Sequence, residues 1–165
     1  MYIETLEDLQ SKMMDSLGNH FPENESIENE EILAKSATEI SLAVSSLILY
    51  FQPTNKDRNP ERVVSQLNLV LRWATAAAFI LEVQLPSEGE RTLYGENWPE
   101  ELLHDGTLAS LVLQNRMTGL VLDYMLEDDY DKAMLGEDIW AVISLVEVIA
   151  TRVLCTFDHA LRHRP

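Results

Sequence analysis

Two residue pairs and one cysteine have the chemical types that could form a reactive site. Arg152 and His159 lie seven positions apart, which places them about 20° apart around a helix that advances about 100° per residue. Glu101 and His104 have the spacing of half a di-iron site, but the chain holds no second Glu-x-x-His pair, so we expect no metal there. Cys155 falls beside acidic residues, where a reactive thiolate is not favoured. We therefore predict that Cys155 is chemically inert.

The Arg152 and His159 pair resembles the Arg-x(4–6)-His motif of the HEPN ribonucleases. In that family, paired helices of a dimer bring the Arg and the His to a scissile phosphate. The resemblance covers two residues, and it implies a ribonuclease in which Arg152 and His159 are catalytic. The other interpretation is that both side chains pair with nearby acids, such as Glu147 and Asp158, or lie in solvent. We favour the second interpretation, so we predict no catalytic residue and keep the ribonuclease as an alternative function.

Acidic residues could also hold two metal ions in an all-α nucleotide pyrophosphohydrolase. Such enzymes typically carry an E-E-x-x-E run that is answered by an E-x-x-D pair on a facing helix. Here Glu30 and Glu31 begin such a run but the third acid is missing, and Ala150 follows Glu147 where the aspartate should be. The pattern is incomplete at both places. We therefore predict no bound metal and no cofactor, and this enzyme class is the second alternative.

The stretch Pro60–Pro86 predicts the helix around which the rest of the chain is organised. Asn59 is a good N-cap, and Pro60 suits the first helical position because its missing N–H would have no helical partner there. Apolar residues then cover most of the circumference, which places this helix in the core. Apolar periods of three to four residues predict further helices over Ile3–Leu17, Ile27–Phe51, Thr107–Glu127 and Glu137–Leu161.

These elements predict one all-α domain over residues 1–165. We expect a helical bundle of four long helices, with an N-terminal helix and one short helix that ends near His104. Asn97 and Glu100 are the capping pair expected for the short helix. The segment between Pro86 and Asn97 is rich in glycine and charge, so we expect a loop there.

The composition favours some classes of protein and disfavours others. Hydrophobic residues make up 46% of the 165 residues, so the composition is not that of a disordered chain. There is no apolar signal region at the start, and no apolar run reaches the ~18 residues of a membrane span. The single cysteine excludes an intrachain disulfide. We therefore expect a cytoplasmic protein that does not enter a membrane. Its net charge of −16 makes direct binding to nucleic acid unexpected.

The acidity is concentrated in two segments. Residues 1–31 carry a net charge of −8 and residues 96–138 carry −9, and the densest acidic run includes Asp128 and Asp129. Either these acids only keep the chain soluble, or they meet a partner protein with a basic surface.

The sequence therefore favours an interaction protein over an enzyme. Large apolar residues outside the expected core faces indicate an interface. We expect binding to another protein, or to a second copy, through an apolar patch rimmed by acids, with these contact residues: Phe79, Trp73, Trp98, Asp128 and Asp129. Small acidic helical proteins include inhibitors, immunity-type proteins and nucleic-acid mimics, and all three classes fit the sequence.

Overall fold

The computed structural model describes residues 29–56, 59–126 and 132–155, and every regular element in these ranges is helical. The elements are α2 (Asn29–Phe51), α3 (Pro60–Ile80), α4 (Glu88–Glu96), α5 (Glu100–Leu103), α6 (Gly106–Leu126), α7 (Lys132–Val148) and the π-helical turn η1 (Ile149–Val153). The all-α prediction is therefore confirmed. The predicted N-terminal helix Ile3–Leu17 lies outside the described residues.

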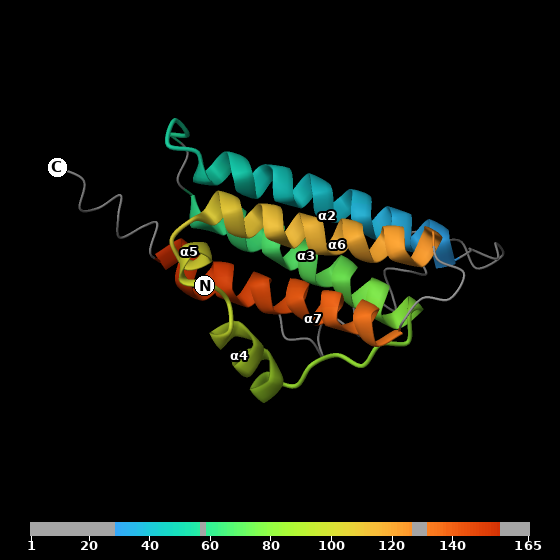
Figure 1. The fold of residues 1–165 in the computed structure, drawn as a ribbon. Helices are drawn as coiled ribbons and strands as arrows, with labels where there is room; N and C mark the ends of the chain where they lie inside the picture. Colours follow the sequence, from blue (N-terminus) through green and yellow to red (C-terminus); the bar gives the residue numbers. More distant parts are fainter. Residues whose placement is uncertain (1–28, 57–58, 127–131, 156–165) are drawn as a thin grey trace.

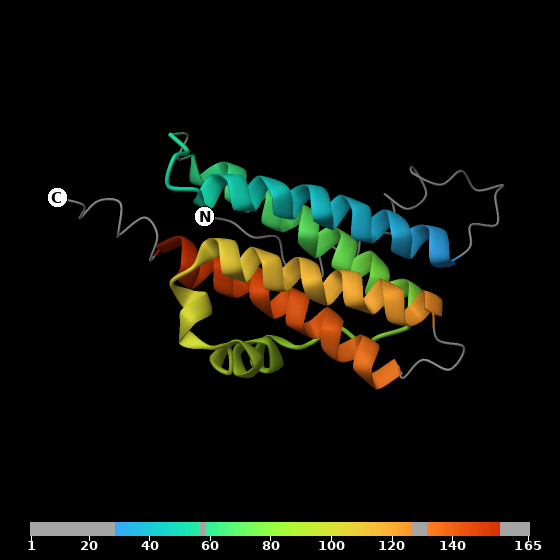
Figure 2. The same ribbon diagram turned by 45° about the horizontal axis from the view of Figure 1, so that its top comes forward.

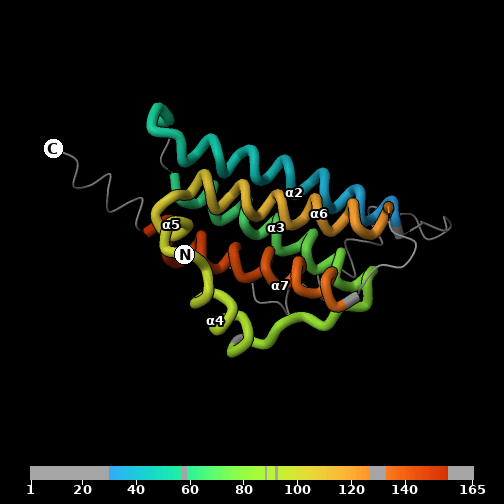
Figure 3. The backbone as a smooth tube through the Cα atoms, viewed as in Figure 1, coloured from blue at the N-terminus to red at the C-terminus, as the bar shows by residue number. Residues whose placement is uncertain are grey.

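The four long helices lie side by side (Figures 1 and 2). α2 packs against α3 and α6, and α7 packs against the same two helices. The tube in Figure 3 shows that α2 and α6 run in opposite directions. α4 packs against α7, and α5 packs against α6 and η1, so the two short helices lie at one edge of the bundle.

The helix α3 forms as its sequence signals predict. The Asn59 side chain accepts a hydrogen bond from the backbone N–H of Glu61 at 3.1 Å, and Pro60 occupies the first helical position. The helix ends at Ile80 rather than near Pro86, because the backbone turns at Glu82, whose φ of 54° is left-handed.

The core lies between the inward faces of the four long helices. Ten residues of α3 are buried, which confirms that most of its circumference is covered. The largest side chains that are fully buried come from all four helices: Leu33, Ile40, Leu47, Leu67, Leu113, Met117, Leu120, Leu135, Ile139, Ile143 and Leu145. Close packing of such side chains is the main source of stability in a bundle.

One short helix stands where a loop was expected. α4 is closed at its start by a reciprocal capping box, in which the Ser87 hydroxyl accepts from the Glu90 N–H and the Glu90 carboxylate accepts from the Ser87 N–H. Asn97 does not cap α5 as predicted. Its side-chain amide donates to the Leu93 carbonyl at 3.2 Å and lies at the end of α4. The bundle therefore carries two short helices among the described residues, rather than one.

The starts of α6 and α7 also differ from the prediction. Asp105 caps α6, since its carboxylate accepts from the Leu108 N–H at 3.0 Å. Gly106 packs on the Phe51 ring so closely that a Cβ there would lie 2.3 Å from ring carbons. This contact joins the start of α6 to the end of α2. α7 begins at Lys132, five residues before the predicted start.

Two described helices, Glu30–Phe51 and Pro60–Ile80, are long and apolar enough to cross a membrane by length and composition. This corrects the expectation that no segment meets that criterion, because a mean over 18 residues tolerates the isolated charges that interrupt an apolar run. Within the bundle, 39% of the first apolar window and 56% of the second are buried. A core helix of a soluble protein passes the same test.

Candidate functional site

The helices α4 and α5 carry an apolar residue among exposed acids. Leu93 lies on the outer side of α4, and 64% of its surface is exposed. Exposed glutamates precede and follow it along the two helices, and we call Leu93 and these four residues the α4–α5 ridge: Glu90, Glu96, Glu100 and Glu101. On α4, Glu90 and Glu96 are each three residues from Leu93, which places them one helical turn away on the same side. On α4, the ridge is therefore one exposed leucine with an acidic residue one turn to either side.

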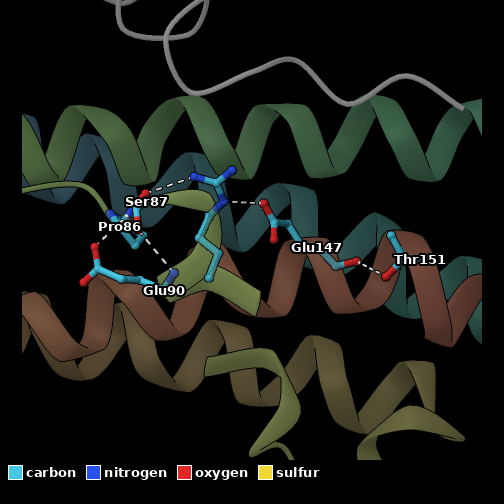
Figure 4. A network of polar contacts seen from close by, with 6 residues as sticks. Pro86, Ser87, Glu90, Glu147 and Thr151 are labelled. Atoms are coloured by element: carbon cyan, nitrogen blue, oxygen red, sulfur yellow. Dashed lines mark hydrogen bonds and ion pairs between the residues drawn. The ribbon is translucent and has the colours of Figure 1, made fainter. Parts of the chain in front are cut away.

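Arg91 holds α4 against the bundle through two partners, Glu147 and Pro86, which Figure 4 labels. Its Nε donates to Glu147 Oε1 of α7 at 2.7 Å, and its Nη1 donates to the carbonyl oxygen of Pro86 at 2.9 Å. The Arg91 side chain is only 17% exposed, so its charge faces inward and is neutralised by Glu147. Arg91 is the one basic residue in the sequence of α4. The outer side of this helix is therefore left with its acids.

Trp98 and Gly95 complete the contact between α4 and α7. The Trp98 indole Nε1 donates to the Ser144 hydroxyl at 3.0 Å, and its ring lies 5.8 Å from the Tyr94 ring. Gly95 is buried, and a Cβ there would lie 3.5 Å from a methyl group of Val148. Trp98 was predicted to lie on an exposed helix, but it is half-buried against the core. Its side chain fixes the position of the ridge.

A second ion pair joins α6 to α7 near Tyr94. Arg116 Nη1 donates to Asp138 Oδ1 at 3.2 Å. Burial raises the pKa of the Asp138 carboxyl above its usual value, while the hydrogen bond and the charge of Arg116 act in the opposite direction. Burial likewise raises the pKa of the Tyr94 hydroxyl, and the Arg116 charge again opposes the shift. Arg116, like Arg91, therefore forms an ion pair that holds two helices together.

The α4–α5 ridge is chemically suited to attract a basic protein and to give it one apolar contact. Exposed carboxylates attract a basic partner before contact, over the ~8 Å within which charges are not fully screened at physiological ionic strength. The exposed imidazole of His104 is the basic group near them, with its Nε2 3.9 Å from Glu100 Oε1. Burying the exposed part of Leu93 under a partner would stabilise a complex by on the order of 1 kcal/mol.

The other predicted contact residues do not meet at one place. Phe79 is 60% exposed on α3, as its position on the polar stripe predicted. Trp73 is only 7% exposed and belongs to the core, because the neighbouring helices cover the edge of α3 on which it lies. It therefore offers almost no surface to a partner. Asp128 and Asp129 lie outside the described residues.

The residues of the ribonuclease hypothesis are described only in part. Arg152 is exposed within the π-helical turn η1, and His159 lies outside the described residues. The angle of about 20° assumed an α-helix throughout. That assumption fails at Arg152, because hydrogen bonds in η1 span five residues, as from the Leu154 N–H to the Ile149 carbonyl, and each residue then advances by less than 100°. Cys155 is exposed and forms no disulfide.

The described residues give little support to a metal or small-molecule site. Among them, no three His, Cys, Asp or Glu side chains lie close enough to hold a metal ion. An open groove of about 620 Å³ lies between the end of α2 and the start of α3, and Arg62 is the charged residue in its lining. Sequence reasoning missed this groove, and its other lining residues include Ser46, Tyr50, Ser65 and Gln66. It gathers no acid and base pair that could do chemistry.

Comparison of the chain with known protein families, with curated protein sequences and with solved structures gave no match.

Proposed function

We propose that this protein is an acidic, cytoplasmic, non-enzymatic interaction protein that binds a basic partner protein through the α4–α5 ridge. In this role the glutamates attract the partner from a distance, and Leu93 is buried when the two surfaces meet. The partner's lysines and arginines would pair with the exposed carboxylates of Glu90 and Glu96 on the outer side of α4. This division of work, in which charge sets the rate of association and apolar contact sets the rate of dissociation, is common in protein complexes.

The observation that carries the proposal is that the nearby arginines are paired with carboxylates of α7. Arg91, which is 17% exposed, pairs with Glu147 of α7, and Arg116, which is 42% exposed, pairs with Asp138 of the same helix. Because Arg91 is the one basic residue of α4, its pairing with Glu147 leaves the exposed Glu90 and Glu96 without an arginine partner on their own helix. The half-buried Trp98 and the capping box of α4 hold the ridge in one position, which limits the ordering cost of binding.

The test compares two charge reversals of equal size. The double variant Glu96→Lys with Glu100→Lys changes the ridge. The α3 reversal, Glu61→Lys with Glu82→Lys, makes the same change in net charge at exposed acids in the first turn of α3 and just after its end. A partner is first captured from a cell extract with the wild-type chain and identified. Its association and dissociation rates with each variant are then measured by surface plasmon resonance at several salt concentrations.

We expect the ridge reversal to slow association at least about tenfold and to flatten its salt dependence, while the α3 reversal has a smaller effect. Leu93→Ala should speed dissociation without changing the salt dependence. Equal effects of the two reversals would show that only net charge matters, and an unchanged Leu93→Ala complex would place the contact elsewhere. Either result would refute the ridge as the binding site.

A further inference from the structure

The outer side of the C-terminal half of α2 is uncharged and carries two exposed leucines. Leu42 and Leu49 are 61% and 66% exposed, and Thr38 and Ser45 are exposed on the same stripe. These four residues follow one another at spacings of four, three and four, the repeat of helices that pack against other helices. The charged residues of α2 end at Glu39, so the last twelve residues of the helix carry no charge.

The outer side of α6 has the same character. Its exposed stripe keeps spacings of three and four over five turns: Leu108, Leu111, Asn115, Thr118, Leu122 and Met125. Arg116 and Asp123 are the charged residues of this helix. Arg116 pairs with Asp138 of α7, and the Asp123 charge acts on the same carboxyl, so both lie on the side of α6 that faces α7. No charged residue of α6 falls on the outer stripe.

The two helices that carry these stripes lie next to each other. α2 and α6 are packed side by side in opposite directions (Figures 1 and 2), and Phe51 at the end of α2 meets Gly106 at the start of α6. Seven of the ten large hydrophobic residues that are exposed in the described part of the chain belong to these two helices. We call the two stripes together the α2–α6 face.

We infer that the α2–α6 face is the interface through which two copies of this chain form a dimer. Each copy carries a charge of −16, so two copies repel each other wherever their acids meet. The α2–α6 face is where they can approach without that cost. Leucine side chains project from this face, and the small side chains of serine and threonine leave space between them. Two identical faces can therefore pack together as helices do in a coiled coil.

The size of the face agrees with a dimer. The twelve uncharged residues of α2 span ~18 Å and the 21 residues of α6 span ~30 Å, and each helix offers a strip ~10 Å wide. Each copy would then bury ~480 Å², or ~1,000 Å² for the complex, which is the size of a weak or transient interface. A lipid surface fits less well, because hydroxyl and amide groups interrupt the stripes and anionic headgroups would repel the chain.

The experiment is sedimentation velocity of the full chain from about 1 μM to about 100 μM, a range that brackets the affinity of small interfaces. We expect the wild-type protein to move from one to two times its chain mass of 18.8 kDa. Leu42→Glu should weaken the dimer at least about tenfold, because it buries a charge without a partner in an apolar interface. Thr118→Glu should do the same from an exposed polar position, where folding does not depend on the side chain. Met134→Glu is the control, since Met134 is 58% exposed on α7, outside the face.

A wild-type chain that keeps the mass of one copy over the whole range would overturn the inference. So would a Met134→Glu variant that weakens the dimer as much as Leu42→Glu does. Flotation with neutral phosphatidylcholine vesicles tests the lipid alternative, and a monomer that floats with these vesicles would assign the face to a membrane instead. The α4–α5 ridge lies on other helices, so none of these outcomes supports or contradicts the proposed binding of a partner there.

Discussion

Replacing Gly106 with alanine should destabilise the protein although alanine is the better helix former. A Cβ at this position would lie 2.3 Å from Cγ and Cδ1 of the Phe51 ring and 2.5 Å from Cδ2. Ordinary contact begins near 3.4 Å, so the ring would have to move by about 1 Å. The ring cannot move freely, since Phe51 is 5% exposed and stands edge-on to Tyr50 at 5.4 Å.

The expected cost follows from two opposing terms. Overpacking a close contact costs about 1–3 kcal/mol, and exchanging glycine for alanine inside a helix returns at most ~1 kcal/mol, less at its first residue. We expect Gly106→Ala to lower the free energy of unfolding by about 1–2 kcal/mol in a urea titration. Gly119→Ala is the matched control in the same helix, because a Cβ there meets nothing within 4 Å. This control variant should be as stable as the wild type or more stable.

A double variant identifies the cause of the loss. If the Phe51 ring is responsible, Gly106→Ala should cost at least ~1 kcal/mol less in a Phe51→Leu background than in the wild type, since contacting residues are not additive. Equal stability of the Gly106→Ala and Gly119→Ala variants would refute the close packing of α2 on α6. The face proposed for dimerisation depends on that packing.

Two further predictions concern the core and the response to pH. Leu71 is 2% exposed in the middle of α3, so Leu71→Ala should cost about 2–5 kcal/mol in a urea titration, and a loss below about 1 kcal/mol would show that α3 is misplaced. Burial raises the folded-state pKa of Asp138 above 3.8, so its contribution to stability is full below that pH and is lost as the pH rises through the folded pKa. The stability of the wild type relative to Asp138→Asn should therefore fall from acid to neutral pH, and a constant or rising difference would contradict the shift.

The sequence predicted α3 well because its signals are local. Asn59 and Pro60 fix the start of the helix through a hydrogen bond and a preset φ, and both are readable from neighbouring letters. α4 also has a readable signal, the Ser87 and Glu90 capping box, but the glycines that flank its middle suggested a loop. Gly95 lies in this helix because it packs against α7, a contact that the local sequence does not contain.

Which apolar residues are exposed could be predicted from the sequence only for helices that have a polar side. Phe79 is exposed as its position outside the core face of α3 predicted. The sequence of α6 does not indicate which side of the helix faces the core, because apolar residues lie on all its sides. Packing against the neighbouring helices decides that Leu113 is buried while Leu111 is exposed. Trp73 lies at the boundary between two sides of α3, where the position of the neighbouring helix decides its burial.

The two proposed surfaces depend on salt in opposite directions, and this follows from how the chain distributes its charge. Salt screens the attraction between the glutamates of the α4–α5 ridge and a basic partner, so that complex should weaken as salt rises. Salt also screens the repulsion between two chains of charge −16, while the apolar contacts of the α2–α6 face do not depend on screening, so the dimer should strengthen. A dimer would in turn present two ridges and twice the charge to a basic partner, which raises its rate of association at low salt. An uncharged face on a strongly acidic chain thus makes the acidity more effective, because self-association adds charge without bringing carboxylates together.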